Sequence, residues 1–385
     1  MFKFQLLITL AASAGMAVAH VERAPALSNG WAEAPFVAGD TETTGDGVKN
    51  KTTVAPHATV TFALHVAERN LNKVKEIAVA VSTPSSSTYG EYLDADTLAA
   101  LTAPEPAHAN AVRSWLRDAV PLAHSSAIKE IQGRRFEITL PVADAEALLQ
   151  TTFRFVINSR TGQRALVAGD YTIPDQIKYA TAAVFGLHGL PLPPRDHATS
   201  DSPPGGIAQV TPAVIKAKYG TSAAPTAKKS SGNKQAVAEF QGQTMDPKDL
   251  KQFFQQYVPN APPGADTVSK FVGDPGRGTA QVEANLDIQY IMGVAPGIDT
   301  EFWSYQSADF CADLKNWTSM LLAVGGDAPL VTSVSYGWQG PLIELGCAET
   351  NVAAVDADFA KLAASGITII FASGDSGSGY QPGYD

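Results

Sequence analysis

The stretch that decides the fold is NVAAVDADFAKLAASGITIIFAS, residues 351–373. Four apolar side chains recur in it at helical spacing and predict the buried side of a helix: Val352, Val355, Phe359 and Leu362. Gly366 ends this helix, and the continuous apolar run from Ile367 predicts a strand buried on both faces. A helix followed at once by such a strand is typical of a parallel sheet covered by helices.

The same alternation extends upstream from this stretch. Apolar strands are predicted for QAVAEFQG (235–242), IDTEFWSY (298–305) and VTSVSYG (331–337). Helices are predicted for MDPKDLKQFFQQYV (245–258), VEANLDIQYIMGV (282–294) and DFCADLKNWTSMLLAV (309–324), the first with Asp246 as N-cap and Pro247 in its first turn. The second part of the chain is therefore an α/β domain, in which active sites gather at the carboxyl ends of the strands.

The first part of the chain follows a different pattern. ATVTFALHVA (58–67) alternates, so that Val60, Phe62, Leu64 and Val66 predict a half-buried strand. Further strands (RRFEITLPV, 134–142; RFVINSR, 154–160) interleave with helices (from about residue 70; HANAVRSWLRDAV, 108–120; ADAEALLQTTF, 143–153). Interleaved short strands and helices predict an α+β domain.

Two processing segments are predicted. Lys3, the apolar run of residues 6–14 and the small residues Ala17 and Ala19 predict a signal peptide over residues 1–19. Proline, serine and glycine accumulate between residues 191 and 206 and predict an exposed linker that is open to cleavage. The expected order is signal peptide 1–19, flexible leader 20–57, first domain 58–190, linker 191–206 and second domain 207–385.

Composition narrows the class of protein. The chain has 385 residues, of which 45% are hydrophobic and 17% charged, as expected for a globular protein and not for a disordered one. Its formal net charge of −10 argues against nucleic acid or an anionic membrane as a partner. No apolar run beyond the signal peptide is long enough to anchor the chain in a membrane. We therefore expect a secreted protein, or one that works in an acidic compartment of the secretory route.

Export makes Cys311 and Cys347 candidates for a disulfide, with two isolated thiols as the alternative. If bridged, the loop would contribute roughly 3–4 kcal/mol in the chain-entropy model. The triplets that begin at Asn50 and Asn316 are possible glycosylation sites.

The tetrapeptide Gly-Asp-Ser-Gly at residues 374–377 raises the question whether Ser376 is a nucleophile. A trypsin-like Ser376 needs a histidine base and a double β-barrel, which the α/β pattern rules out. All seven histidines lie before residue 198, so the second domain has no imidazole of its own. The α/β-hydrolase elbow also fails, because Ser occupies residue 378. Ser376 is therefore interpreted as an ordinary loop residue.

A carboxylate can replace the missing histidine as the base. Glu283 and Asp287 are four residues apart, so the predicted helix places both on one face. Two carboxyl groups at contact distance share a proton, and the pKa of one is raised. Such a pair can act as base and relay at an acidic pH at which a histidine is already protonated. A solvated helix face is the alternative, and the apolar neighbours Leu286 and Ile288 argue against it.

Three motifs in order, VEANLDIQYIMGVAPG, VTSVSYGW and GITIIFASGDSG, resemble the sedolisin family of serine-carboxyl peptidases, which includes tripeptidyl peptidases. Residues 62–101, from FALHVAERN to DTLAAL, resemble that family's pro-kumamolisin-type activation pro-domain. The resemblance implies a subtilisin-like fold, a zymogen whose pro-domain acts as intramolecular inhibitor, and a Ser–Glu–Asp triad. It assigns the general base to Glu283, the acid that orients it to Asp287, and a protonated oxyanion-hole donor to Asp375.

The sequence departs from the family at two points. The resemblance implies a nucleophile in a Ser-Gly-Thr-Ser motif and a calcium site, and both are expected beyond residue 385. The string YGTS at residues 219–222 follows no predicted strand and is rejected as that motif. No nucleophile and no metal ligand are therefore predicted in this chain, the sheet is expected to be incomplete, and the chain alone is expected to be inactive.

Three hypotheses remain open from the sequence. The first is a secreted, monomeric peptidase zymogen that hydrolyses peptides or proteins at acidic pH. The second is a non-catalytic secreted protein whose pro-domain serves as a peptidase inhibitor or binding module. The third is a degenerate gene product without function.

Overall fold

The computed structural model describes residues 20–24, 26–27, 30–34, 54–192, 209–221, 232–273, 280–307, 309–338 and 340–374. The predicted signal peptide, Asn50, Asp375 and Ser376 lie outside the described residues. We call the described residues up to Leu192 the N-terminal half and those from Gln209 onwards the C-terminal half.

A five-stranded parallel sheet with the order β11-β12-β10-β13-β14 forms the C-terminal half. Its strands are β10 (Lys234–Glu239), β11 (Lys270–Gly273), β12 (Asp299–Ser304), β13 (Val331–Val334) and β14 (Thr368–Phe371). Its helices are α6 (Pro212–Lys218), α7 (Pro247–Tyr257), α8 (Val282–Val294), α9 (Phe310–Val324) and α10 (Glu349–Ala364), with 3-10 turns at Gly325–Asp327 and Leu342–Leu345. The prediction of an α/β fold with a parallel sheet between helices is confirmed.

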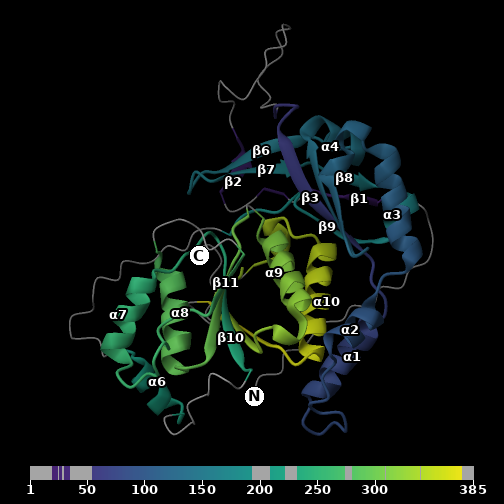
Figure 1. Ribbon diagram of the computed structural model, residues 1–385. Coiled ribbons are helices and arrows are strands. Elements are labelled where there is room, and N and C mark those ends of the chain that lie inside the picture. Colours follow the sequence, from purple (N-terminus) through teal and green to yellow (C-terminus); the bar gives the residue numbers. More distant parts are fainter. Residues whose placement is uncertain are drawn as a thin grey trace.

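Helices cover both faces of this sheet (Figure 1). On one face, Val237 and Phe302 pack against apolar residues of α7 and α8. On the other face, Trp303 packs with Trp317 of α9 and Leu362 of α10. Successive side chains of a strand point to opposite faces, so strands covered on both sides must be apolar throughout. This explains the apolar runs of β10 and β12, which are buried along almost their whole length. The prediction of a strand buried on both faces is wrong for β14 at the side of the sheet, where Ile370 is 56% and Phe371 42% exposed, because no element of the described chain covers them.

Local capping explains where two of the helices begin. The Asp246 side chain accepts a hydrogen bond from the backbone N–H of Lys248 at 2.7 Å, directly before Pro247 opens α7. The Asp309 side chain accepts one from the backbone N–H of Ala312 at 2.8 Å at the start of α9. Each carboxylate satisfies a backbone donor that the first helical turn leaves unpaired.

The N-terminal half is built around a four-stranded antiparallel sheet with the order β4-β5-β3-β9. The strands of this sheet are β3 (Thr59–Val66), β4 (Ile128–Ile131), β5 (Arg135–Pro141) and β9 (Thr181–Phe185). The same half also contains β6 (Phe153–Asn158), β7 (Arg164–Ala168) and β8 (Tyr171–Ile173), which lie in smaller sheets. The helices of the N-terminal half are α1 (Leu71–Ser82), α2 (Ala95–Thr102), α3 (Pro106–Ala119), α4 (Val142–Leu149) and α5 (Asp175–Lys178), with a 3-10 turn at Leu122–Ala127. The alternating apolar residues of β3 fill its core, as the sequence predicts.

Two short strands lie inside the predicted flexible leader. β1 (His20–Glu22) pairs with β8, and β2 (Trp31–Glu33) pairs with β6. Trp31 packs into a small apolar cluster with Val156 and Leu190. For these segments paired strands replace the predicted leader, because their backbone groups and the Trp31 ring find partners that are distant in sequence.

The two halves are in direct contact. α1 packs on α10, and the backbone N–H of Leu93 donates to the carbonyl of Ala364 at the end of α10 at 2.9 Å (Figure 1). β9 also lies against α10, where the Asn351 side chain donates to the carbonyl of Val184 at 2.7 Å. The N-terminal half thus covers the outer side of α9 and α10, away from the sheet.

Candidate active site

The predicted acid pair lies at the start of α8. Glu283 is in the first turn and is 8% exposed, and Asp287 follows one turn later and is half-buried. The neighbouring Asn285 fixes this end of the helix, because its side chain accepts from the backbone N–H of Asp246 at 3.0 Å and donates to Asp249 at 2.8 Å. α8 is therefore anchored to the start of α7, and its acidic face does not point into open solvent.

A third carboxyl group joins the pair. Glu239 is the last residue of β10, the central strand of the sheet, and it is 0% exposed. The hydroxyl of Tyr336, just after β13, donates a hydrogen bond to Glu239 Oε2 at 2.9 Å. Glu283 and Asp287 both act on Glu239 and Tyr336 through their charges. Strand ends and a helix N-terminus thus bring four titratable side chains to one edge of the sheet.

The electrostatics of this cluster favour a stored proton. Burial raises the pKa of Glu239 well above its ordinary range, and the negative charges of Asp287 and Glu283 raise it further, whereas the Tyr336 hydroxyl opposes the shift. Burial also raises the pKa of Tyr336, as does the charge of Glu239. A buried group of carboxyls that cannot all ionise holds at least one proton. Such a group can accept and pass on a proton at acidic pH.

Two further carboxyl groups lie at the same end of the sheet, where β12 leads into α9. Asp309 accepts from the backbone N–H of Gly186 in the N-terminal half at 3.0 Å, and burial raises its pKa. Asp313 accepts from the backbone N–H of Ser307 at 2.9 Å, and burial raises its pKa to about 7. Because Asp309 binds the backbone of the N-terminal half, it belongs to the contact between the halves, whereas Asp313 holds the turn before its own helix.

The remaining predicted residues have the following places. Cys311, at the start of α9, and Cys347, before α10, are joined by a disulfide with a Cα–Cα distance of 5.9 Å. Asn316 lies half-buried in the middle of α9. β14 ends at Phe371 beside β13, so the chain leads towards residue 375 from the same sheet edge that carries Glu239.

The sequence analysis missed Glu239 and Tyr336. Both residues lie inside segments that were predicted as strands: Glu239 ends QAVAE, and Tyr336 ends VTSVSY. For Glu239 the sequence offered a signal: it is the one carboxylate at the end of an otherwise apolar strand, and the carboxyl ends of parallel strands face the active site.

Among the described residues, no three His, Cys, Asp or Glu side chains are grouped so that they could hold a metal ion. A carboxyl cluster that stores a proton is also a poor calcium site, which needs ionised oxygen ligands. In the same ranges, no helix has the length and apolar character needed to cross a membrane.

Known proteins resemble both halves of this chain. Residues 46–190 match the pro-kumamolisin activation domain. Tripeptidyl-peptidase 1 of Macaca fascicularis and of Homo sapiens are each 31% identical to this chain over 333 residues, which is 83% of this chain and 56% of the relative. Tripeptidyl-peptidase 1 of Bos taurus is 31% identical over 329 residues. The chain therefore spans just over half the length of these relatives, and the resemblance predicted from its motifs is confirmed.

Proposed function

We propose that this chain, a relative of the sedolisin-family peptidases with their activation domain at its N-terminus, is the pro-form of a serine-type peptidase that works at acidic pH. Peptides or proteins are its substrates. The N-terminal half is its intramolecular inhibitor, and secretion or an acidic compartment of the secretory route is its location.

The observation that carries this proposal is the buried carboxyl cluster at the carboxyl end of β10. Glu283 accepts the proton of an attacking serine hydroxyl, and Asp287 holds Glu283 in position. Glu239, with its raised pKa, keeps a proton beside them and limits the negative charge of the cluster. This assignment fits the absence of histidine between residues 198 and 385.

The remaining roles follow from the family pattern. Asp375, as a protonated carboxylic acid, donates a hydrogen bond to the oxyanion that forms when the peptide carbonyl is attacked. The attacking serine is not assigned to any residue of this chain. Calcium is part of the family pattern, but the described residues offer no site for it, and no step depends on it.

The path of the chain as it leaves the N-terminal half supports the inhibitory role. The backbone N–H of Leu190 donates to the carbonyl of Leu345 at 2.8 Å, and that of Phe310 donates to the carbonyl of Leu190 at 3.2 Å. The Gln241 side chain, two residues after Glu239, then donates to the carbonyl of Leu192 at 2.9 Å. The segment that leads into the predicted linker therefore lies next to the acidic edge of the sheet, where a substrate would have to bind.

Two measurements test the proposed function. Sequencing transcripts past codon 385 locates the nucleophile: a continued reading frame with Ser-Gly-Thr-Ser is expected, and a stop at that codon in every transcript contradicts the proposal. The product of the complete frame should cleave a fluorogenic tripeptide substrate at about pH 4, below the ordinary range of the histidine pKa.

Matched variants then separate catalysis from folding. Glu283→Gln and Asp287→Asn should abolish most turnover without changing the circular dichroism spectrum. Asp299→Asn is the control: this residue begins β12, at the end of the sheet opposite the carboxyl cluster, and the variant should retain turnover. Near-normal turnover in Glu283→Gln would rule out Glu283 as the general base.

A non-catalytic role is the second candidate. The separate apolar core of the N-terminal half favours it, because a self-contained domain can bind a partner without chemistry. The full chain should then inhibit a related active peptidase at micromolar concentration. Absence of inhibition would remove this candidate.

A further inference from the structure

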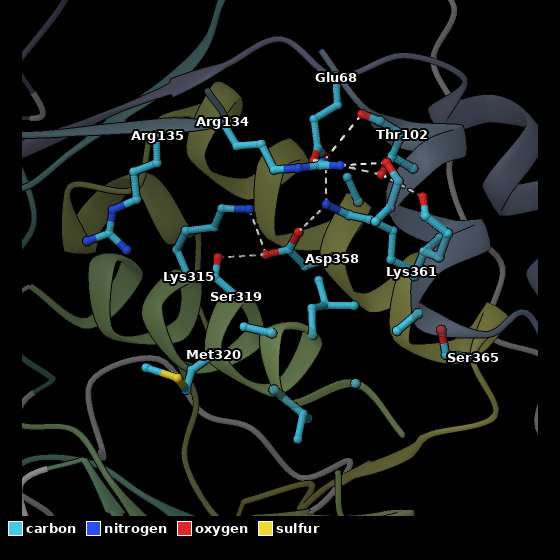
Figure 2. Close-up of a pocket in the computed structure, with 18 of the residues that line it drawn as sticks. Glu68, Thr102, Arg134, Arg135, Lys315, Ser319, Met320, Asp358, Lys361 and Ser365 are labelled. Atoms are coloured by element: carbon cyan, nitrogen blue, oxygen red, sulfur yellow. Dashed lines mark hydrogen bonds and ion pairs between the residues drawn. The ribbon is translucent and has the colours of Figure 1, made fainter. Parts of the chain in front are cut away.

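A network of buried charges joins the two halves of the molecule (Figure 2). Asp358 of α10 is 1% exposed on its side chain and pairs with Lys315 of α9 at 2.6 Å and with Lys361 of α10 at 2.7 Å. Lys361 in turn pairs with Glu68 of the N-terminal half at 2.5 Å, and Glu68 also pairs with Arg134. Each of these charges has an opposite charge beside it.

A cavity of about 670 Å³ lies beside this network, between the halves. Its wall includes His65, Glu68 and Arg135 from the N-terminal half and Lys315 and Asp358 from the C-terminal half. Most of the wall is apolar, but the space is partly open to solvent and its charged side chains can bind water. Water, and therefore protons, can reach the side chains that line it.

Of the five side chains just named, His65 takes part in no ion pair of the network. It lies on β3, on the face opposite the N-terminal core, and is 8% exposed. Its ring meets the ring of Phe185 edge to face, with a centroid distance of 5.2 Å. Ala183 and Phe185 of the same sheet face are packed into the core cluster of α9 and α10. His65 is therefore buried by the docking of the halves and not by the core of its own domain.

The charges that face His65 come from three elements. Arg135 of β5 is its partner across the ladder and pairs with Glu137 at 2.6 Å. Lys315 of α9, and Asp358 and Lys361 of α10, act on His65 through their charges, whereas β9, with the sequence TAAVF, has none. Burial is the first cause that lowers the pKa of His65, the charges of Lys315 and Arg135 add to it, and Asp358 opposes them.

We propose that His65 is a proton-sensitive contact that loosens the N-terminal half from α9 and α10 when its imidazole is protonated. A protonated ring would add a positive charge, shielded from bulk water, next to Arg135 and Lys315. Separation of the halves returns the ring to water and removes this cost. The inference concerns docking alone, so it holds or fails independently of peptide hydrolysis.

The direction of the pH effect follows from linkage. In the docked state the pKa of His65 lies below its ordinary value, so the separated state binds more protons. The contribution of His65 to docking is at full strength above about pH 6.5 and weakens as the pH falls, by at most about tenfold per pH unit. Asp309, whose pKa burial raises at the same contact, acts in the opposite direction, so the effect of His65 is the difference between the wild type and His65→Gln. The carboxylate of Asp358, whose pKa its two lysines lower, loses its contribution only below about pH 4, so the two effects occupy different windows.

Hydrogen exchange of the full chain tests the proposal. Exchange of peptides from β9 and α10 is compared at about pH 7.5, 6.5 and 5.5, after correction for the intrinsic rate. In the wild type, protection of these peptides should fall by up to about tenfold between about pH 6.5 and 5.5. His65→Gln, which cannot be protonated, should keep its protection across that range.

Two histidine variants are the controls. His124 lies in the same half, is partly exposed and pairs with Asp144 at 3.2 Å, so His124→Gln should respond to pH as the wild type does. His188 is buried, but its ring faces its own half, with Nε2 at 2.8 Å from the carbonyl of Gly169 and the ring near Tyr171. His188→Gln should therefore also keep the wild-type response.

A wild type without a pH response in this range overturns the proposal, and so does a His65→Gln chain with the wild-type response. If His65→Gln is unprotected even at about pH 7.5, Arg135→Gln decides, because it keeps the imidazole and removes one facing cation. A smaller pH response in Arg135→Gln supports the proposal, and an unchanged one contradicts it.

Discussion

Glu68 and Lys361 are 293 residues apart in the sequence and form an ion pair of 2.5 Å across the contact between the two halves. Both side chains are largely shielded from water, and Lys361 also pairs with Asp358. Removing one partner of a buried pair leaves the other charge uncompensated, which costs more than the pair itself contributes. This relationship makes the docking of the halves sensitive to single charges.

Glu68→Gln should weaken docking by at most about 3 kcal/mol, because Lys361 loses its partner in the N-terminal half and keeps only Asp358 of its own helix. Limited proteolysis near Leu192 at neutral pH measures the effect as faster cleavage. Asp356→Asn is the matched control: it breaks the more exposed pair with Lys75, at 2.6 Å, and should cost at most about 1 kcal/mol. Equal effects of the two substitutions would contradict the assigned role of Glu68.

Glu239→Gln should stabilise the C-terminal half at neutral pH. A carboxyl group with a raised pKa contributes its full stability below its unfolded pKa and loses that contribution as the pH rises through the folded pKa. The neutral amide has no such loss. The Tm of Glu239→Gln should therefore be higher than that of the wild type at about pH 7 and similar to it at about pH 4. A lower Tm at neutral pH would mean that Glu239 is ionised and held by hydrogen bonds.

Gly346→Ala should disturb the contact between the halves. Gly346 has a φ of 76°, and a Cβ there would meet the carbonyl oxygen of His188. Left-handed strain alone costs about 1–3 kcal/mol, and the clash adds to it. Gly326→Ala is the control, because nothing lies within 4 Å of its added Cβ. Hydrogen exchange of peptides that contain Leu190 should rise in the first variant and stay unchanged in the second.

Asn316 should carry no glycan in the folded chain, although its triplet fits the acceptor pattern. The residue lines the cavity between the halves, and the hydroxyl of the fully buried Thr318 donates to Asp358 at 2.8 Å. A glycan at this position would have to occupy the docking contact. The mass of the secreted protein should therefore be lowered by the same amount by glycosidase treatment in wild type and in Asn316→Gln.

Much of the architecture can be predicted from local pattern. The segment VEANLDIQYIMGV coincides with α8, and Asp246 with Pro247 opens α7 as predicted. Strands β10, β12, β13 and β14 lie at the predicted segments, whereas β11 (Lys270–Gly273) was not predicted. Such features depend on neighbours one turn or one pleat away, so their physical causes lie inside the segment itself.

Burial by a distant partner could not be predicted in this way. The alternation of β3 predicts one buried face, but docking also buries Ala63 and His65 on the other. Val352 was predicted to lie on the buried side of its helix and is 36% exposed, so that prediction is wrong. The helical spacing shows which residues share a face but does not show where the covering elements end.

The sequence by itself determined the alternation of helices and strands in the C-terminal half, the relationship to a peptidase family and the placement of Glu283 and Asp287 on one helix face. The tertiary structure alone decided that Glu239 and Tyr336 join them and that His65 lies among the cations of the docking contact. Helical and strand periods are local properties of the chain, whereas the pKa of a buried group depends on charges and water that are brought near it, or excluded from it, by segments far apart in the sequence.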